Sequence, residues 1–265
     1  MAPVGIGLAL SLIGDTTLYT VLPDPAIAAE AVLSLTVVCI VLGLNRFIRL
    51  LTNGLFGLVY DRRPRRKIML IAMFIAALST LSYAVSQGPV LILIGRVVWG
   101  AAWSAMWIGA NTMSLDISEN ENRGRVTGRL QMWFYFGVAF SALVSGIFTD
   151  WLGYRGGLYL SSALTGAGFL IWIFMLTETR PSPKSQLAPE EILGPTNRPY
   201  PWLFLAATSV PLFTIGFAFF GILNSTNILW LGKFVDEGLR LGKFILPLAT
   251  LSGILLAGRV LISTL

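Results

Sequence analysis

The sequence predicts an all-α integral membrane protein whose helices cross the bilayer several times. Hydrophobic residues make up 55% of the chain and charged residues only 12%, whereas a soluble globular domain carries about 25% charged residues. The apolar residues form long runs, each close to the roughly 20 residues that a helix needs to cross the hydrocarbon core. Lysines and arginines gather in short loops between these runs, a pattern that orients membrane proteins. The net charge of +6 therefore indicates membrane orientation rather than nucleic-acid binding.

Eight apolar runs are long enough to be membrane spans, and none alternates polar and apolar residues as a transmembrane β-strand would. The expected spans are Val4–Leu22, Ala31–Val59, Ile68–Ser86, Val90–Leu115, Val126–Thr149, Gly157–Leu176, Trp202–Leu231 and Phe244–Leu265. The first run has no basic segment before it, so we expect it to be a retained span rather than a cleaved signal peptide.

The basic loops predict which side of the membrane each end of the helices faces. Arg62–Lys67 carries five basic residues, Arg123–Arg129 carries three, and Arg180–Arg198 carries three more. The loops Pro23–Glu30 and Gln87–Pro89 carry none. Cytoplasmic loops are enriched in Lys and Arg, so we expect the basic loops and the N-terminus to be cytoplasmic, in a plasma or inner membrane. The loop after the seventh span mixes basic and acidic residues and does not follow this pattern.

A polar connector, Thr177–Pro201, divides the predicted spans into two groups. It is rich in proline and mixed charge, which is typical of a linker between compact units. We therefore expect a six-helix bundle at 1–176, a cytoplasmic linker at 177–201 and the start of a second bundle at 202–265. Leu42–Thr52 weakly resembles Leu255–Leu265, as in transporters built from parallel repeats. If the second half repeats the first, roughly four spans are missing, so we expect a truncated chain.

The loop between the second and third spans reads GLVYDRRPRRK over Gly57–Lys67. It resembles the signature of the major facilitator superfamily (MFS), which is Gly, three residues, Asp, a basic residue, any residue, Gly and two basic residues. The matching positions are Gly57, Asp61, Arg62, Pro64, Arg65 and Arg66. Pro64 stands where the family has Gly; proline can still form a tight turn, but it lacks an N–H donor and φ freedom.

Other segments resemble the same family. They are GRVVWGAAWSA (Gly95–Ala105), ENRGRVTG (Glu121–Gly128) and LTETRP (Leu176–Pro181). The resemblance implies an MFS-type six-helix bundle plus the first two helices of a second bundle. It also implies that the signature loop is a charge latch that closes the cytoplasmic side; the alternative is a topology signal only. The fifth span lacks the Gly-Pro pattern of the family's antiporters, which weakens an antiporter assignment.

Ionisable and polar residues inside the spans are candidates for a central cavity, because such residues are costly in hydrocarbon. The candidates are Asp15, Tyr19, Arg46, Arg96, Trp103, Asn111, Gln131 and Asn224. Asp15 is expected to pair with Arg96 or Arg46. Purely structural roles are the alternatives. Asp15 would then be a buried partner of an arginine, Arg46 would extend toward the lipid headgroups, and the tryptophans would pack the core or anchor the helix at the membrane interface.

These features favour a secondary active transporter of a small organic solute that works by alternating access. No P-loop pattern is present, so an ion gradient, preferably of protons, would supply the energy, and efflux is one possible direction. Asp15 is the candidate proton carrier. The alternatives are a non-transporting fragment and, less expected, a membrane-embedded enzyme, since the chain has no His and one Cys. The expected partners are the bilayer, the solute and a co-transported or exchanged ion, with no nucleic acid, cofactor, metal or catalytic residue.

The predicted topology can be tested with reporter tags placed beside Arg63 and Gly88. We expect the two tags in opposite compartments, because the loop at Arg63 is strongly basic and the loop at Gly88 has no basic residue. Accessibility of each tag to an impermeant reagent in intact and permeabilised cells gives the answer. Both tags in one compartment would contradict the topology.

Overall fold

The computed structural model describes residues 1–180, 222–235, 238–241 and 244–262, with a few isolated positions between 203 and 214. In chain order the elements are α1 (Ala2–Thr20), α2 (Pro25–Glu30), α3 (Leu35–Arg62), α4 (Arg65–Val85), α5 (Pro89–Asp116), α6 (Arg123–Met175), α8 (Asn224–Phe234), β1 (Leu239–Leu241), β2 (Phe244–Leu246) and α9 (Leu248–Ile262). Among them α1, α3, α4, α5 and α6 are long and apolar enough to cross a membrane. The predicted all-α membrane fold is confirmed.

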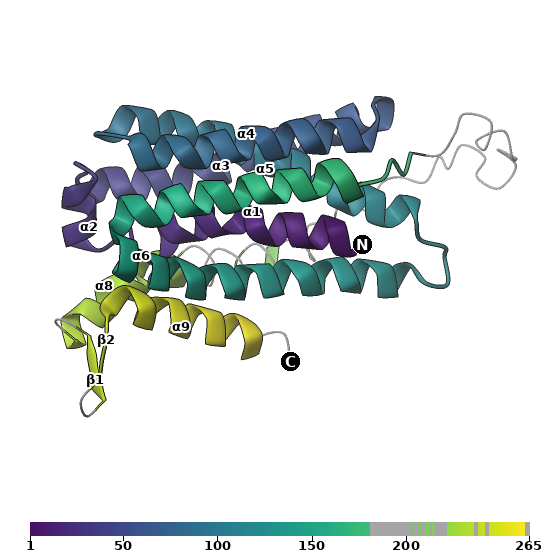
Figure 1. The fold of residues 1–265 in the computed structure, drawn as a ribbon. Helices are drawn as coiled ribbons and strands as arrows, with labels where there is room; N and C mark the ends of the chain where they lie inside the picture. The colour runs from purple at the N-terminus through teal and green to yellow at the C-terminus, as the bar shows by residue number, and fades with distance from the viewer. Residues whose placement is uncertain are drawn as a thin grey trace, which may run out of the picture.

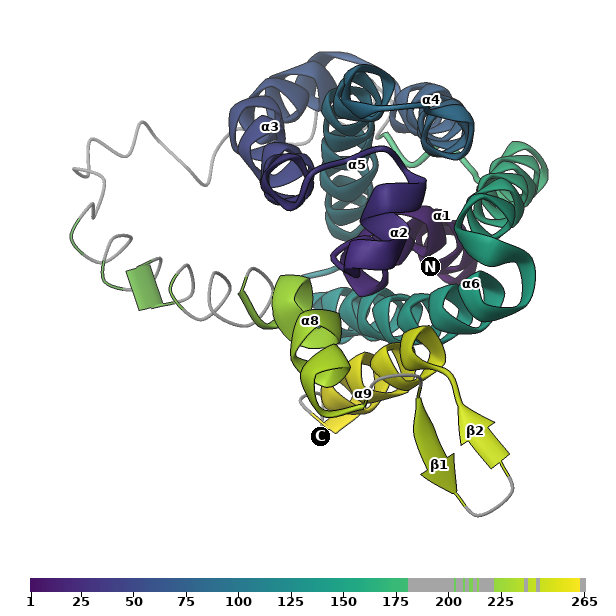
Figure 2. The same ribbon diagram turned by 90° about the vertical axis from the view of Figure 1, so that its left-hand side faces the viewer.

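The helices α1, α3, α4, α5 and α6 lie roughly parallel or antiparallel in one bundle (Figure 1). Seen along the bundle, α1 lies inside the ring that the other helices form (Figure 2). Most residues of α1 are buried, including Ser11, Asp15 and Thr17. The central position of α1 explains why a helix of modest hydropathy carries these polar groups: its neighbours, not lipid, surround it.

The two ends of the bundle differ in chemistry. The N-terminus, the turn between α3 and α4, the loop between α5 and α6 and the end of α6 gather at one end (Figure 1). Among these segments, the turn between α3 and α4 carries five basic residues, Arg62–Lys67, and the start of α6 carries three, Arg123–Arg129. Helix α2, which falls in the predicted loop Pro23–Glu30, lies at the other end with the turn between α4 and α5. The connectivity therefore places the basic loops on one side, as the predicted topology requires.

Helix α6 contains both the fifth and the sixth predicted spans. The chain turns back at Gly153, whose φ of 73° and ψ of 169° are not helical. A positive φ of this kind is accessible to glycine at little cost but strained for a residue with a β-carbon. Figure 1 shows the two arms of α6 running in opposite directions, with α1 between them in this view. One glycine thus replaces a longer loop between two spans.

The region after the connector differs in part from the prediction. Half of the seventh predicted span, Trp202–Leu231, lies outside the described residues, and α8 covers only its last part. The eighth span was expected to begin at Phe244, which was wrong. Phe244–Leu246 forms β2, paired antiparallel with β1, and the helix begins at Leu248 after Pro247. Proline limits where a helix can begin, and the apolar residues of the strand made the run look longer.

Helix α9 packs against α6 through small side chains. Gly146 of α6 lies against the backbone of Ala249, and Gly253 of α9 lies against the backbone of Ala142. Small residues let membrane helices approach closely enough for van der Waals contact between backbones. The Asp150 carboxylate also accepts hydrogen bonds from the backbone N–H and the hydroxyl of Thr250, in the first turn of α9. The chain after the connector is thereby joined to the first bundle.

The outer surface of the bundle is apolar. Helix α3 exposes Phe47, Leu50, Leu51, Leu55 and Leu58, and α4 and α5 expose comparable side chains. A soluble protein rarely exposes so large an apolar patch. Such a surface is suited to a lipid bilayer. There the backbone hydrogen bonds must be made within the protein, and an α-helix makes them within itself.

The close contact of α9 with α6 yields a stability prediction. A β-carbon at Gly253 would lie 2.4 Å from the Ala142 carbonyl oxygen, whereas one at Gly258 would meet nothing within 4 Å. We expect Gly253→Ala to lower the stability by about 1–3 kcal/mol through overpacking. The matched control Gly258→Ala should be neutral or slightly stabilising, because alanine favours the helix by roughly 1 kcal/mol. Thermal unfolding of both purified variants is the measurement, and equal midpoints would contradict the packing described.

Candidate functional site

An ion pair between Asp15 and Arg96 lies in the middle of the bundle. Oδ1 of Asp15, on α1, accepts a hydrogen bond from Nη1 of Arg96, on α5. The Arg96 side chain is fully buried and that of Asp15 is 11% exposed. Charged groups in such surroundings are unfavourable unless they are paired. Of the two partners that the sequence left open for Asp15, the structure brings Arg96 into contact.

The other donors of Arg96 reach two neighbouring helices. Its Nε donates to the carbonyl oxygen of Val41 at 3.0 Å, and its Nη2 donates to the Tyr19 hydroxyl at 3.0 Å. That hydroxyl in turn donates to a second α3 carbonyl at 3.0 Å. Nδ2 of Asn45 donates to the Asp15 carboxylate at 3.2 Å. One buried arginine therefore links α1, α3 and α5.

Aromatic rings surround the guanidinium of Arg96. Its central carbon lies 5.3 Å from the centroid of the Tyr19 ring and 5.9 Å from those of Tyr83 and Trp99. Ring faces attract cations, and the attraction strengthens where water is excluded. Removing one member of a buried ion pair costs about 3–5 kcal/mol, because the other charge is left uncompensated. The pair is thus both a structural centre of the bundle and a site where a change of charge has large effects.

A ladder of three tryptophans extends from this pair along α5. Trp99 stacks on Trp103 with centroids 5.4 Å apart, and Trp103 stacks on Trp107 at 6.1 Å. The spacing of four residues places the three rings on one helix face. Phe134 of α6 lies 4.8 Å from the Trp107 ring, and the Arg49 guanidinium lies 5.6 Å from the Trp103 ring. We call Trp99, Trp103 and Trp107 the tryptophan ladder.

The remaining cavity candidates are more dispersed. Arg46 lies over the Tyr19 ring at 5.6 Å. The Asn111 amide donates to a carbonyl one turn earlier on its own helix, at 2.8 Å. Gln131 is half-buried near the start of α6. Asn224 begins α8, and its side chain lies outside the described part of the chain. Their role in a common cavity stays a prediction.

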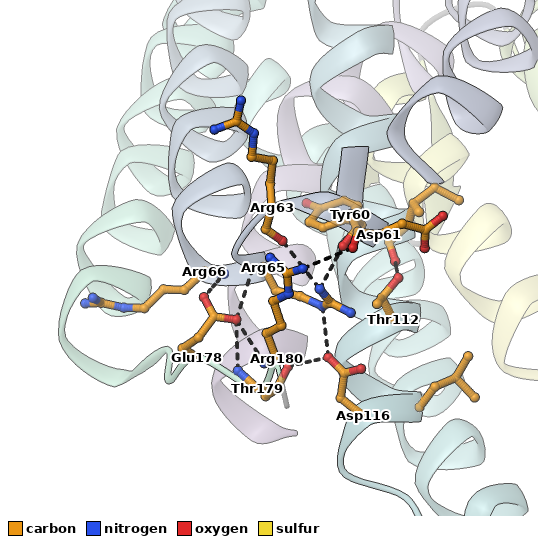
Figure 3. A network of polar contacts seen from close by, with 12 residues as sticks. Tyr60, Asp61, Arg63, Arg65, Arg66, Thr112, Asp116, Glu178, Thr179 and Arg180 are labelled. Atoms are coloured by element: carbon orange, nitrogen blue, oxygen red, sulfur yellow. Dashed lines mark hydrogen bonds and ion pairs between the residues drawn. The ribbon is translucent and has the colours of Figure 1, made fainter. Parts of the chain in front are cut away.

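The signature loop belongs to a second polar network, at the basic end of the bundle (Figure 3). Nε of Arg65 pairs with Oδ2 of Asp116, at the end of α5, at 3.0 Å. Nη1 of Arg65 donates to the Tyr60 carbonyl at 2.7 Å. Nη2 of Arg66 donates to the carbonyl of Ile173, near the end of α6, at 2.7 Å. The two arginines after the turn thus tie α4 to α3, α5 and α6.

Glu178 caps the start of α4. Pro64 precedes this helix and offers no side-chain cap. Oε1 of Glu178 accepts from the backbone N–H of Arg65 at 3.0 Å, and Oε2 accepts from that of Arg66 at 3.1 Å. The first N–H groups of a helix have no partner within it, and the positive end of the helix dipole favours a carboxylate there. A residue more than 100 positions away therefore supplies what the proline cannot.

These contacts shift the ionisation of Glu178. Partial burial on its own would raise the pKa of the carboxyl group. Hydrogen bonds from the backbone N–H groups of Arg180, Arg66, Arg65 and Thr179 favour the charged form and together outweigh burial. The net result is a pKa below the ordinary value of 4.5. Glu178 is therefore a carboxylate at neutral pH.

Arg180 binds the opposite kind of helix end. Its Nη1 donates to the Arg62 carbonyl at 2.8 Å and its Nη2 to the Asp61 carbonyl at 3.2 Å, both at the end of α3. Cations are favoured there, because the last carbonyls of a helix lack partners. The Asp61 side chain itself is exposed and has no hydrogen-bond or ion-pair partner among the described residues. Gly57 faces open space within the described chain.

Several residues of these two networks were not among the predicted site residues. They are Asn45, Asp116, Glu178 and Thr179, the last of which donates to Asp116 at 2.9 Å. Glu178 and Thr179 lie in the LTETRP segment, which carried the family resemblance, so a signal was present. Asp116 ends the fourth span and offered no pattern, because its partner is 51 residues away.

The bundle of membrane-spanning helices with a buried ion pair and a charged loop after the second span has the organisation of a transporter. The sequence profile described as the Major Facilitator Superfamily matches residues 4–265. The chain belongs to this superfamily. It is therefore a membrane protein of a transporter family and not an enzyme.

Curated relatives match about half of the chain. A protein of Gibberella zeae named as a rubrofusarin-specific efflux pump is 24% identical over 124 residues, which are 47% of this chain and 23% of that protein. Tetracycline resistance protein, class E, of Escherichia coli is 24% identical over 140 residues, 53% of this chain and 34% of that protein. A probable efflux pump of Penicillium aethiopicum is 25% identical over 143 residues, 53% of this chain and 26% of that protein. The matches thus cover at most about a third of these three relatives.

The cap that Glu178 provides yields a prediction with a defined pH dependence. We expect Glu178→Gln to destabilise the protein at pH 7 by about 0.5–2 kcal/mol, the usual worth of a helix cap. Because the folded-state pKa is lowered, the cap contributes fully above pH 4.5 and is lost as the pH falls through that lowered value. The gap in thermal midpoint between wild type and variant should therefore shrink in acid. The control is Glu121→Gln, which removes an exposed carboxylate from the loop between α5 and α6. A difference in thermal midpoint between wild type and Glu178→Gln that did not depend on pH would contradict the capping role.

Proposed function

We propose that the chain acts in proton-coupled movement of a small organic solute across a membrane, by alternating access. The observation that carries the proposal is the buried pair of Asp15 and Arg96, because a titratable carboxylate at the centre of a bundle is the feature that proton coupling requires. The family supports transport in general. The pair is the specific part of the proposal.

Protonation of Asp15 would change the balance of charge around Arg96. A guanidinium that loses its counter-charge inside the bundle is strongly disfavoured. Arg96 must then meet another acceptor, or the helices around it must move. Its remaining hydrogen bonds end on α1 and α3, so a shift of Arg96 acts on both helices at once. This is how binding of one proton can be converted into a change in packing.

The network at the basic end is the candidate latch. Arg65, Arg66, Asp116 and Glu178 hold the ends of α3, α4, α5 and α6 together. We propose that this end stays rigid within the first bundle while Asp61, which is exposed, is available to contact a second bundle. In this proposal the rigid latch transmits changes at the ion pair to the basic side of the membrane.

The direction of transport is proposed to be outward. Two of the relatives reported above are named as efflux pumps and a third as a resistance protein, which supports export.

The test of proton coupling is Asp15→Asn in reconstituted vesicles. We expect the variant to lose transport driven by a pH gradient by at least tenfold, because asparagine carries no titratable proton. Counterflow exchange of solute, which needs no gradient, should persist. Asp24→Asn, which alters a helix-capping carboxylate in the loop after α1, is the matched control and should retain both activities. Driven transport at the wild-type rate in Asp15→Asn would reject the coupling role.

A double variant separates coupling from a purely structural role. Asp15→Asn leaves Arg96 buried without a counter-charge, which by itself could unfold the bundle. Asp15→Asn with Arg96→Gln removes both charges and is expected to be more stable to heat than Asp15→Asn, to retain exchange, and still to lack gradient-driven transport. If the double variant recovers driven transport as well, Asp15 is only a structural partner of Arg96.

A further inference from the structure

The tryptophan ladder has a cation at its middle. The Arg49 guanidinium lies 5.6 Å from the ring of Trp103, and within the part of the chain that the structure describes no carboxylate forms an ion pair with it. Arg49 is only partly buried, whereas Trp103 is 1% exposed. The arginine therefore covers an aromatic wall from its accessible side. Its charge is offset by a ring face rather than by an acid.

Two indole N–H groups of the ladder have no acceptor among the described residues. They are Nε1 of Trp99 and Nε1 of Trp103, and both atoms are buried. Buried donors are nearly always hydrogen-bonded, so such orphans call for an explanation. The buried Asn45 amide oxygen is also unpartnered among the described residues, but it is an acceptor and cannot be satisfied by an anion. The unmet donors lie along the ladder, where an acceptor group of a ligand would satisfy them.

Among the residues that the structure describes, the charge balance around the ladder is positive. Between the helix ends, α1, α3 and α5 carry three cations, Arg46, Arg49 and Arg96, and one acid, Asp15. Asp15 is already engaged by Arg96. The two helices that pack against this region from the other sides, α4 and α6, carry no acid between Arg65 and Val85 or between Arg123 and Thr149. Electrostatics here favour an anion and disfavour a cation.

We propose that the tryptophan ladder and Arg49 form the subsite for a planar aromatic anion, such as a phenolate or an aromatic carboxylate. The aromatic rings supply the stacking surface. The side chains of Trp107 and Phe134 are only half-buried, and their ring centroids lie 4.8 Å apart. Arg49 supplies the charge, and an oxygen of the ligand accepts from the orphaned indole N–H groups. This inference rests on the proposed transport function and narrows its substrate class.

The same geometry argues against two other solute classes. A lipophilic cation would stack on the rings but would meet Arg49, with which no carboxylate of the described residues forms an ion pair. A sugar would find few paired donors and acceptors on the ladder, because indole groups donate only. A planar anion satisfies the stacking, the charge and the donors together.

Binding of matched naphthalene probes to the full chain tests the class. The probes are 2-naphthoate, neutral 2-naphthamide and cationic 2-naphthylmethylammonium, which share one ring system and differ in charge. Scintillation proximity binding in phosphatidylcholine nanodiscs, with empty nanodiscs as the blank, gives each dissociation constant. We expect 2-naphthoate to bind at least tenfold more tightly than either of the other two. Equal or tighter binding of the cation, or no binding of 2-naphthoate, overturns the proposal.

Variants assign the binding to the ladder. Arg49→Gln should weaken 2-naphthoate at least tenfold and leave 2-naphthamide within twofold, whereas Arg129→Gln, an exposed arginine at the start of α6, should change neither. Trp107→Phe, at the half-exposed position of the ladder, should weaken both probes, and Trp151→Phe, which is 82% exposed, is its control. Thermal midpoints within a few degrees of wild type show that each variant is folded. Unchanged 2-naphthoate binding in Arg49→Gln overturns the assignment.

Transport assays distinguish this proposal from the one on which it rests. Selective 2-naphthoate binding that depends on Arg49, without gradient-driven transport, rejects the proposed function and supports the subsite. Gradient-driven transport of 2-naphthylmethylammonium without 2-naphthoate binding supports the function and rejects the subsite.

Discussion

The cost of a charge in a bilayer is the constraint on which this structure depends. Arg96 is fully buried in the middle of the bundle, and it is tolerated because Asp15, Tyr19 and an α3 carbonyl take up its donors. Satisfying one guanidinium in this way fixes the relative positions of α1, α3 and α5. The helices are thus ordered from the inside by one polar centre, while the exposed leucines on α3 contribute little to specificity.

A second electrostatic rule orders the basic end of the bundle. Helix ends carry partial charges and unpaired backbone groups. The carboxylate of Glu178 lies at the positive end of α4, and Arg180 lies at the negative end of α3. Neighbouring residues of one short segment therefore cap two helix ends of opposite partial charge. The basic loop is held by backbone geometry as much as by ion pairs, which explains how Pro64 is accommodated where the family has glycine.

Hydropathy and basic loops were sufficient to predict most of the fold. The six spans of the first bundle and their turns were found because the apolar runs are long and interrupted by charge. Asp15 and Arg96 were found because each is isolated in such a run. Glu178 and Asp116 were missed as site residues, because contacts across 51 to 113 residues leave no local pattern. The β1–β2 hairpin was missed because β2 is as apolar as a span and only Pro247 separates it from α9.

The contacts of Glu178, Thr179 and Arg180 also redraw the border of the first bundle. These residues follow the last turn of α6 and would be assigned to the connector by composition alone. Since they cap two helices, the residues up to Arg180 belong structurally with α3 and α4. An excised bundle or a fusion joint should keep these four extra positions, because a cut immediately after the last span would leave the N-terminal end of α4 uncapped and the last carbonyls of α3 without their cation.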